Sequence, residues 1–185
     1  MEIIHNPVTD AILDRRSIRS YTDETLTEDE VHTLLQCGLR APSAHNRQTT
    51  RFAAVRDRKL LEKLRLEMTE AEEEPSRWLK AFHYGAPCVI FLFDRRGDRW
   101  SGINGAIAAE NIHVAAQGLG LGSVLIGIIR DFMLSERGEA WKARFGIPED
   151  YDFVLAVAVG HPDKPGRDLP RDQGNIVYVK GEDEP

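Results

Sequence analysis

Residues 88–93 read CVIFLF, a continuous apolar run between Pro87 and Asp94. Such a run is typical of a strand whose two faces are both covered by other parts of the protein. A second run of this kind, FVLAVAV, occupies residues 153–159. Together the two runs predict the centre of a sheet that lies between helices.

Helical spacing and start signals surround these runs. Asn6 followed by Pro7 predicts a helix start, because Asn is a favoured N-cap and proline a favoured first residue. Thr27 and Glu30 have the spacing of a capping box, which predicts a second helix ending at Ala41-Pro42. A small-residue-rich helix that runs from Asn104 to about Gly118 is expected at the centre of the domain.

The remaining segments complete the prediction. Further helices are expected over residues 58–68 and 135–145, and further strands over 52–55, 124–128 and 175–179. Loops are expected over residues 17–25 and 43–50, a solvated acidic stretch over 70–74 and a charged turn over 94–102. No internal repeat or linker is visible. The sequence therefore predicts one α+β domain over residues 1–185, with a mixed or antiparallel sheet flanked by helices.

Composition excludes several functions. The chain has 185 residues and a formal charge of −6, which argues against a general nucleic-acid binder. No apolar run approaches the roughly 20 residues of a membrane span, and Met1 leads straight into polar residues. Two isolated cysteines make neither a disulfide framework nor a metal knuckle. We therefore expect a cytoplasmic protein that binds neither nucleic acid nor membrane.

The common catalytic motifs are missing from the sequence. It contains no HExxH zinc motif and no GxSxG nucleophile motif. Residues 118–122, GLGLG, resemble a dinucleotide fingerprint, but they follow a helix rather than a strand. We interpret these glycines as a helix end and a tight turn.

Three polar segments point to a binding site. Residues 15–19, RRSIR, place arginines together, and forked guanidinium donors suit a phosphate, although a solvated basic patch is the alternative. Residues 41–48, APSAHNRQ, carry amide side chains that suit the edge of a flat heterocycle, with an ordinary turn as the alternative. Residues 164–167, KPGR, add basic side chains, or form a simple surface loop.

Taken together and in this order, these segments resemble the FMN-dependent nitroreductase family. The likeness continues through residues 104–106 (NGA), 110–111 (EN), 118–123 (GLGLGS), 126–127 (IG) and 158–162 (AVGHP). It covers nearly the whole chain. The resemblance implies the family's fold and an intertwined homodimer that holds FMN at the interface.

The resemblance also assigns the FMN contacts. The positions that match are Arg15, Arg16, Ser17, Arg19, Pro42, Ser43, Ala44, Asn46, Gln48, Ile126, Gly127, Lys164 and Arg167. By this likeness Arg15 and Ser17 hold the phosphate and ribityl chain, and Arg19 stabilises the ring near N1 and the C2 carbonyl. The loop over residues 41–48 reaches the partner's flavin, and residues 126–127 line the ring near N5. Lys164 and Arg167 finish the phosphate site, with Arg171 as the alternative to Arg167.

The implied activity is an oxidoreductase. NADH or NADPH would donate two electrons through flavin N5, and a nitroaromatic, quinone or flavin acceptor would then replace it in a ping-pong mechanism. No acid–base pair and no metal are expected. The alternatives are a protein that binds or sequesters FMN without turnover, and a specialised branch that acts as a dehalogenase, a flavin-destroying enzyme or a peptide-ring oxidase.

Three features depart from the family's pattern. Thr49, Thr50 and Arg51 replace an aromatic residue, and Asn104 stands where an acidic residue is frequent. Residues 67–85 leave room for only a modest lid over the flavin. The sequence therefore predicts a shallow pocket that admits varied acceptors.

Overall fold

The fold is built on a four-stranded sheet. The structure is a computed structural model and describes residues 2–179. The strands are β1 (Arg51–Val55), β2 (Cys88–Arg95), β3 (Gly122–Ile126) and β4 (Tyr151–Gly160). Their order is β1-β2-β4-β3, and each neighbouring pair is antiparallel. Of the two sheet types that the sequence allowed, the structure has the antiparallel one.

The two apolar runs form the centre of the sheet, as predicted. β2 pairs with β1 on one side and with β4 on the other, and Phe91 lies opposite Ala156. Alternate side chains of β2 enter two separate cores. Ile90 and Leu92 pack in one, and Phe91 and Phe93 in the other. Both cores exclude water, so both faces of the sheet are covered.

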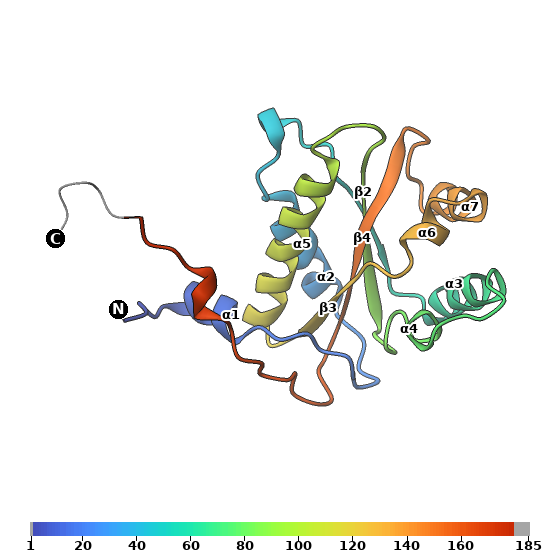
Figure 1. Cartoon of the computed structure of the whole chain (residues 1–185). Coiled ribbons are helices and arrows are strands. Elements are labelled where there is room, and N and C mark those ends of the chain that lie inside the picture. Colours follow the sequence, from blue (N-terminus) through green and yellow to red (C-terminus); the bar gives the residue numbers. More distant parts are fainter. Residues whose placement is uncertain (1, 180–185) are drawn as a thin grey trace.

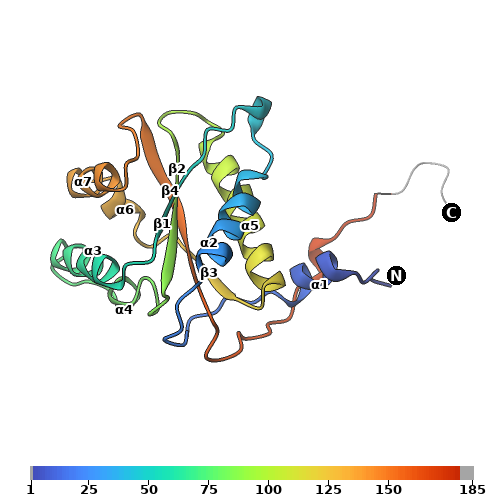
Figure 2. The ribbon, with the colours of Figure 1, turned by 180° about the vertical axis from the view of Figure 1, so that it is seen from behind.

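Helices cover each face of the sheet (Figure 1). The Ile90 side carries α2 (Glu28–Leu39) and α5 (Ser101–Gly118), with α1 (Pro7–Asp14) against the end of α5. The Phe91 side carries α3 (Arg58–Glu70), α4 (Arg77–Lys80), α6 (Arg130–Met133) and α7 (Glu136–Arg144). Figure 2 shows the same two layers from behind.

The central helix is α5, as the sequence predicts. Its small residues allow a close approach to the sheet: a Cβ atom on Gly105 would lie 2.7 Å from Cγ1 of Val154 on β4. A side chain there would push the helix off the strand. The helix ends at the glycines, where Gly120 has a φ of +73°, so the interpretation of GLGLG as a helix end is confirmed.

The predicted caps of α1 and α2 are present. The Asn6 side chain accepts hydrogen bonds from the backbone N–H groups of Val8 and Thr9. Thr27 and Glu30 cap α2 reciprocally. α1, however, buries none of its residues, and Val8 keeps 62% of its surface exposed. Much of the apolar surface of α1 is therefore left uncovered by residues 2–179.

Other predictions are wrong in detail. Residues 175–179 are not a strand: a short 3-10 turn, η2 (Gln173–Asn175), leads into an extended arm that no sheet edge receives. β3 begins at Gly122, earlier than expected, because it pairs with β4 up to Gly160. The charged turn begins only after Arg95, since Asp94 belongs to β2 and is fully buried. Among the helices of residues 2–179, none has both the length and the hydropathy for a membrane span.

Candidate functional site

A cavity lined by basic residues is the principal candidate. It measures about 790 Å³ and lies between the segment after α1, the α4 region and the loop after β4. Its basic lining residues are Arg15, Arg16, Arg19, Arg77, Lys164, Arg167 and Arg171. Ser17 also lines it. The structure thus brings together two of the three predicted segments, although about 150 residues separate them in the sequence.

Backbone pairing fixes the two segments side by side. The Ile18 N–H donates to the Ser123 carbonyl at 3.0 Å, which attaches the N-terminal segment to β3. The Asp163 N–H donates to the Ser20 carbonyl at 3.0 Å and attaches the second segment to the first. Gly166 then lies so close to Arg16 that a Cβ atom there would overlap the arginine side chain. Glycine at this position lets the 164–167 loop close one side of the cavity.

Most of the cavity's positive charge is uncompensated. Arg16 is paired with Asp168 at 2.7 Å. Arg15 Nε lies 3.7 Å from Glu110, too far for a hydrogen bond, and this buried nitrogen has no other partner. The remaining basic side chains have no carboxylate within 4.0 Å in residues 2–179; they are Arg19, Arg77, Lys164, Arg167 and Arg171. Such a group of cations suits an anionic ligand.

A buried histidine contacts Ser123, the residue that attaches the N-terminal segment to β3. His113 of α5 is buried, and its Nδ1 lies 2.7 Å from Ser123 Oγ. Burial lowers the pKa of His113 to about 4, and the positive charge of Arg15 lowers it further in the same direction. The imidazole is therefore uncharged at neutral pH. It therefore adds no further positive charge near Arg15.

The third predicted segment lies in another part of the structure, away from the basic cavity. The loop containing Ser43 and Gln48 follows α2, at the end of α5 away from α1 (Figure 1). The Gln48 N–H donates to Ser43 Oγ at 2.9 Å, and the Gln48 amide donates to Asn46 Oδ1 at 2.9 Å. His45, Asn46 and Gln48 all have positive φ. The backbone of the loop is therefore strained. None of its residues lines the basic cavity of the same chain.

The loop lines a small cavity of its own. This space of about 110 Å³ is bounded by Pro42, Ser43, Gln48 and Asn104, among others. Ala44 contributes its backbone N–H, which donates to Asn104 Oδ1 at 3.1 Å. Asn104 in turn donates to the buried carboxylate of Asp94 at 3.3 Å. The sequence singled out Asn104 but missed Asp94, because the neighbouring arginines make that stretch resemble a surface turn.

Ile126 and Gly127 lie at the end of β3. Ile126 pairs with Ala156 of β4, and its side chain belongs to the core. Gly127 is exposed, with open space where a Cβ would be. Neither residue lines the basic cavity. Their contact with a flavin ring stays a prediction.

Sequence reasoning missed the contribution of α4. Arg77, Trp78 and Tyr84 all line the basic cavity, and they come from the stretch that was expected to form a modest lid. The Arg77 guanidinium lies 4.5 Å from the Trp78 ring centroid. A four-residue helix carries too little periodicity to be recognised, but the Arg-Trp pair after an acidic run was a visible signal.

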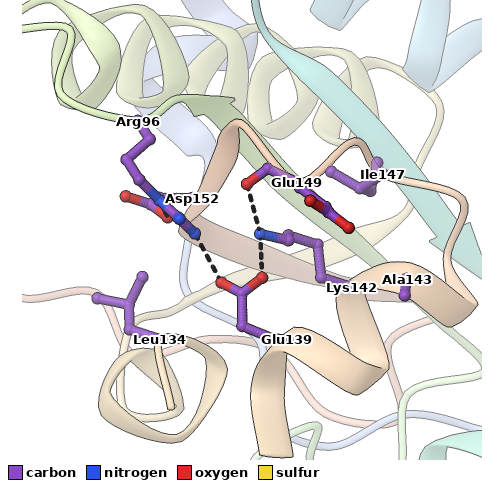
Figure 3. A pocket seen from close by; sticks show the side chains of 8 residues that line it. All are labelled: Arg96, Leu134, Glu139, Lys142, Ala143, Ile147, Glu149 and Asp152. Atoms are coloured by element: carbon purple, nitrogen blue, oxygen red, sulfur yellow. Dashed lines mark hydrogen bonds and ion pairs between the residues drawn. The ribbon is translucent and has the colours of Figure 1, made fainter. Parts of the chain in front are cut away.

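A second polar pocket, of about 660 Å³, lies beside α7 (Figure 3). Lys142 is buried there, and its Nζ lies 2.5 Å from Glu139 and donates to the backbone carbonyls of Tyr151 at 2.7 Å and Glu149 at 3.1 Å. All three ammonium protons therefore have acceptors. We interpret this group as a structural connection between α7 and β4.

The fold and the cationic cavity define an α+β protein with a site suited to an anionic ligand. The model of the nitroreductase family matches residues 12–161, and the chain belongs to this family. A Bacillus subtilis FMN reductase (NADPH) is 30% identical, with 94% of this chain and 73% of that protein covered.

Solved structures agree with this assignment. A Bacteroides fragilis nitroreductase with bound FMN superimposes with a TM-score of 0.88 at 26% identity, covering 95% of this chain and 100% of the other. A Desulfitobacterium hafniense nitroreductase with bound FMN gives a TM-score of 0.84 at 26% identity, covering 96% and 100%. The chain therefore has the nitroreductase-like fold predicted from its sequence.

Proposed function

We propose that this chain is an FMN-dependent oxidoreductase that transfers two electrons from NADH or NADPH to nitroaromatic, quinone or flavin acceptors. Family membership and the FMN bound in similar structures support the proposal. The observation that carries it is the group of uncompensated cations around one cavity, which includes the buried Arg15 Nε that lacks a hydrogen-bond partner.

The residues of the cavity fit the phosphate of FMN. A phosphate monoester carries a charge of about −1.5 to −2 at neutral pH, and several guanidinium forks match it. Arg15, Lys164 and Arg167 would hold the phosphate with the Ser17 hydroxyl, and Arg171 is the alternative to Arg167. Arg16 is committed to Asp168 and would mainly position the segment.

Arg19 would act on the ring rather than on the phosphate. FMN, when bound, supplies hydride chemistry at N5. The Arg19 side chain would place a fixed positive charge near N1, where negative charge grows as electrons arrive. The backbone at Ile126 and Gly127 would lie near N5. Donor and acceptor would use the same open face in turn, which is a ping-pong mechanism, and no side chain need act as an acid or base.

We further propose a homodimer that completes each site. An apolar groove of α1, α2 and α5 residues, among them Val8, Ile12 and Val114, has no partner within residues 2–179. The Ser43–Gln48 loop also lies away from the basic cavity of its own chain. A second copy covering this groove would bury the apolar face and bring its loop to the other chain's flavin. Pro42, Ser43, Ala44, Asn46 and Gln48 would then contact the flavin of the partner.

Residues 1–185 would form one FMN-binding unit of this dimer. A cytoplasmic location, predicted from the sequence, stays a prediction.

The visible spectrum and the oligomeric state test the proposal. The purified protein should show the absorbance of bound flavin and elute as a dimer. Replacing both Arg15 and Arg167 with alanine should release FMN, whereas Arg144→Ala on the exposed side of α7 should retain it. A colourless monomer that does not take up added FMN would contradict the proposal.

Electron transfer separates the enzyme from a protein that only sequesters FMN. Anaerobic NADH or NADPH should bleach the flavin band, and menadione should restore it within the turnover time. Bound flavin that neither nicotinamide reduces would support the sequestering alternative. Turnover confined to a halogenated aromatic, to flavin destruction or to a peptide ring would support a specialised branch of the family.

A further inference from the structure

The basic cavity contains more positive charge than FMN requires. Five of its cations have no carboxylate partner in the described part of the chain, and Arg15 is only loosely paired. The phosphate accounts for about two charges, and the N1 region for one more. At least two cations therefore remain for a second anionic group.

Arg77 is the surplus cation that stands apart. It comes from α4, whereas the other cavity cations come from the segment after α1 and from the loop after β4. Its guanidinium stacks on Trp78, a residue that keeps 47% of its surface exposed. Stacking fixes the guanidinium plane and leaves its N–H edge free for a carboxylate or phosphate.

An aromatic surface accompanies this charge. Tyr84 lines the same cavity, and the Arg19 guanidinium lies 5.8 Å from its ring centroid. Exposed Trp78 and half-buried Tyr84 offer faces on which a planar ring can stack. This part of the cavity, formed by Arg77, Trp78 and Tyr84, therefore combines stacking surfaces with a cation that forms no ion pair within residues 2–179.

We infer that Arg77 and Trp78 recognise an anionic group that lies beside a planar ring of the substrate. The inference rests on the proposed function. The shared chemistry is a phosphate or carboxylate beside an aromatic ring, and two substrates offer it. One is the electron donor, through the adenosine 2′-phosphate of NADPH. The other is an electron acceptor that carries a carboxylate on its aromatic ring.

Binding and kinetics together test the inference on the FMN-loaded protein. Calorimetry would compare adenosine 2′-monophosphate with adenosine, and benzoate with benzamide. Stopped-flow kinetics would compare NADPH with NADH in the reductive half, and 4-nitrobenzoate with 4-nitrobenzamide in the oxidative half. The wild-type protein should favour the anionic member of at least one pair. A preference in the nucleotide pair identifies the donor, and a preference in the benzoate pair the acceptor.

Arg77→Gln should remove that preference. A charge-assisted hydrogen bond contributes enough for the favoured anion to lose about tenfold or more in affinity and rate. The affinity and rate for the neutral member of the pair should change less than about twofold, because it makes no charge-assisted hydrogen bond with Arg77. The variant should retain FMN. Lys80→Gln is the matched control, because Lys80 is exposed on the same helix but does not line the cavity. It should behave as wild type.

Several outcomes would overturn the inference. These are a wild-type protein without preference in either pair, an equal loss for neutral and anionic members, or an equal effect of Lys80→Gln. Release of FMN from Arg77→Gln would place Arg77 in the cofactor site instead. A wild-type protein that binds no FMN would refute the proposed function and the inference with it, whereas an FMN-loaded protein without the anionic preference would refute the inference alone.

Discussion

Asn104 connects the buried carboxylate of Asp94 to the backbone of the loop that follows α2. Its amide donates to Asp94 Oδ2 at 3.3 Å, and its carbonyl oxygen accepts from the Ala44 N–H at 3.1 Å. Asp94 is fully buried, and it also accepts from Thr50 Oγ1 at 3.0 Å. A residue of the central sheet therefore holds both ends of a loop whose backbone is strained.

Replacing Asn104 with alanine should loosen this loop. The Ala44 N–H and one Asp94 oxygen would each lose a partner, at a cost of about 1–3 kcal/mol in the free energy of unfolding. If the loop completes the partner's flavin site, FMN should also bind several-fold more weakly. Urea unfolding of the FMN-free protein and titration with FMN measure the two effects separately.

The control for Asn104→Ala is Ser135→Ala. Ser135 caps α7, where its hydroxyl accepts from the Gly138 N–H, and its loss should cost about 1 kcal/mol. FMN affinity should stay as in wild type. Equal losses of FMN affinity in the two variants would show that Asn104 acts on global stability alone.

Arg19→Gln should lower the flavin midpoint potential more than it weakens FMN binding. A unit charge at about 4 Å contributes roughly 4 kcal/mol at an effective dielectric constant near 20. Because Arg19 is exposed, solvent reduces that value, and we expect a shift of about 30 mV, equivalent to about 1.4 kcal/mol. Spectroelectrochemical titration measures it, with Arg144→Gln as the distant control. An unchanged potential combined with FMN release would move Arg19 into the phosphate site.

His113 should make the protein sensitive to acid. Its pKa is lowered from 6.5 to about 4 in the folded chain, so the unfolded chain binds more protons between these values. The contribution of His113 to the free energy of unfolding is fully present above pH 6.5 and is lost as the pH drops toward 4. The loss is roughly 3 kcal/mol, at about 1.4 kcal/mol per pKa unit. Burial also lowers the pKa of His83, which adds a loss in the same direction.

Urea unfolding at several pH values, compared between wild type and His113→Gln, isolates this contribution. The variant should be less stable than wild type at pH 7.5 but should lose less stability on acidification. The same pH dependence in both proteins would assign the acid sensitivity to other groups. His83→Gln provides the matched comparison for the second histidine.

Local signals predicted much of the fold. The two apolar runs at 88–93 and 153–159 identified the central strands, since a strand that is covered on both faces carries continuous apolar side chains. Capping residues located the starts of α1 and α2. Residues 175–179 misled, because their apolar pattern suits a strand, whereas a strand also requires a neighbour, and no strand of residues 2–179 pairs with them.

The sequence predicted only those parts of the site that lie in short motifs. Segments 15–19 and 164–167 meet as expected, because arginine-rich and glycine-containing segments carry a recognisable chemistry. Arg77 and Asp94 were missed for a physical reason. Their roles depend on burial and on neighbours distant in sequence, and neither quantity is visible in a local pattern.

Lys142→Met should destabilise the protein without affecting FMN. The change leaves the carbonyls of Glu149 and Tyr151 without the Lys142 donor and Glu139 with only Arg96, at 2.8 Å (Figure 3). Breaking a buried ionic group typically costs roughly 3 kcal/mol or more. FMN content should not change, because these residues share no member with the basic cavity.

Lys63→Met is the matched control for this variant. Lys63 pairs with Glu67 at 3.8 Å on the exposed side of α3, and such surface pairs contribute at most about 1 kcal/mol. Urea unfolding should therefore separate the two lysine variants by about 2 kcal/mol or more. Similar stability in both would mean that water replaces the Lys142 ammonium at the two carbonyls, and that the connection between α7 and β4 does not depend on this side chain.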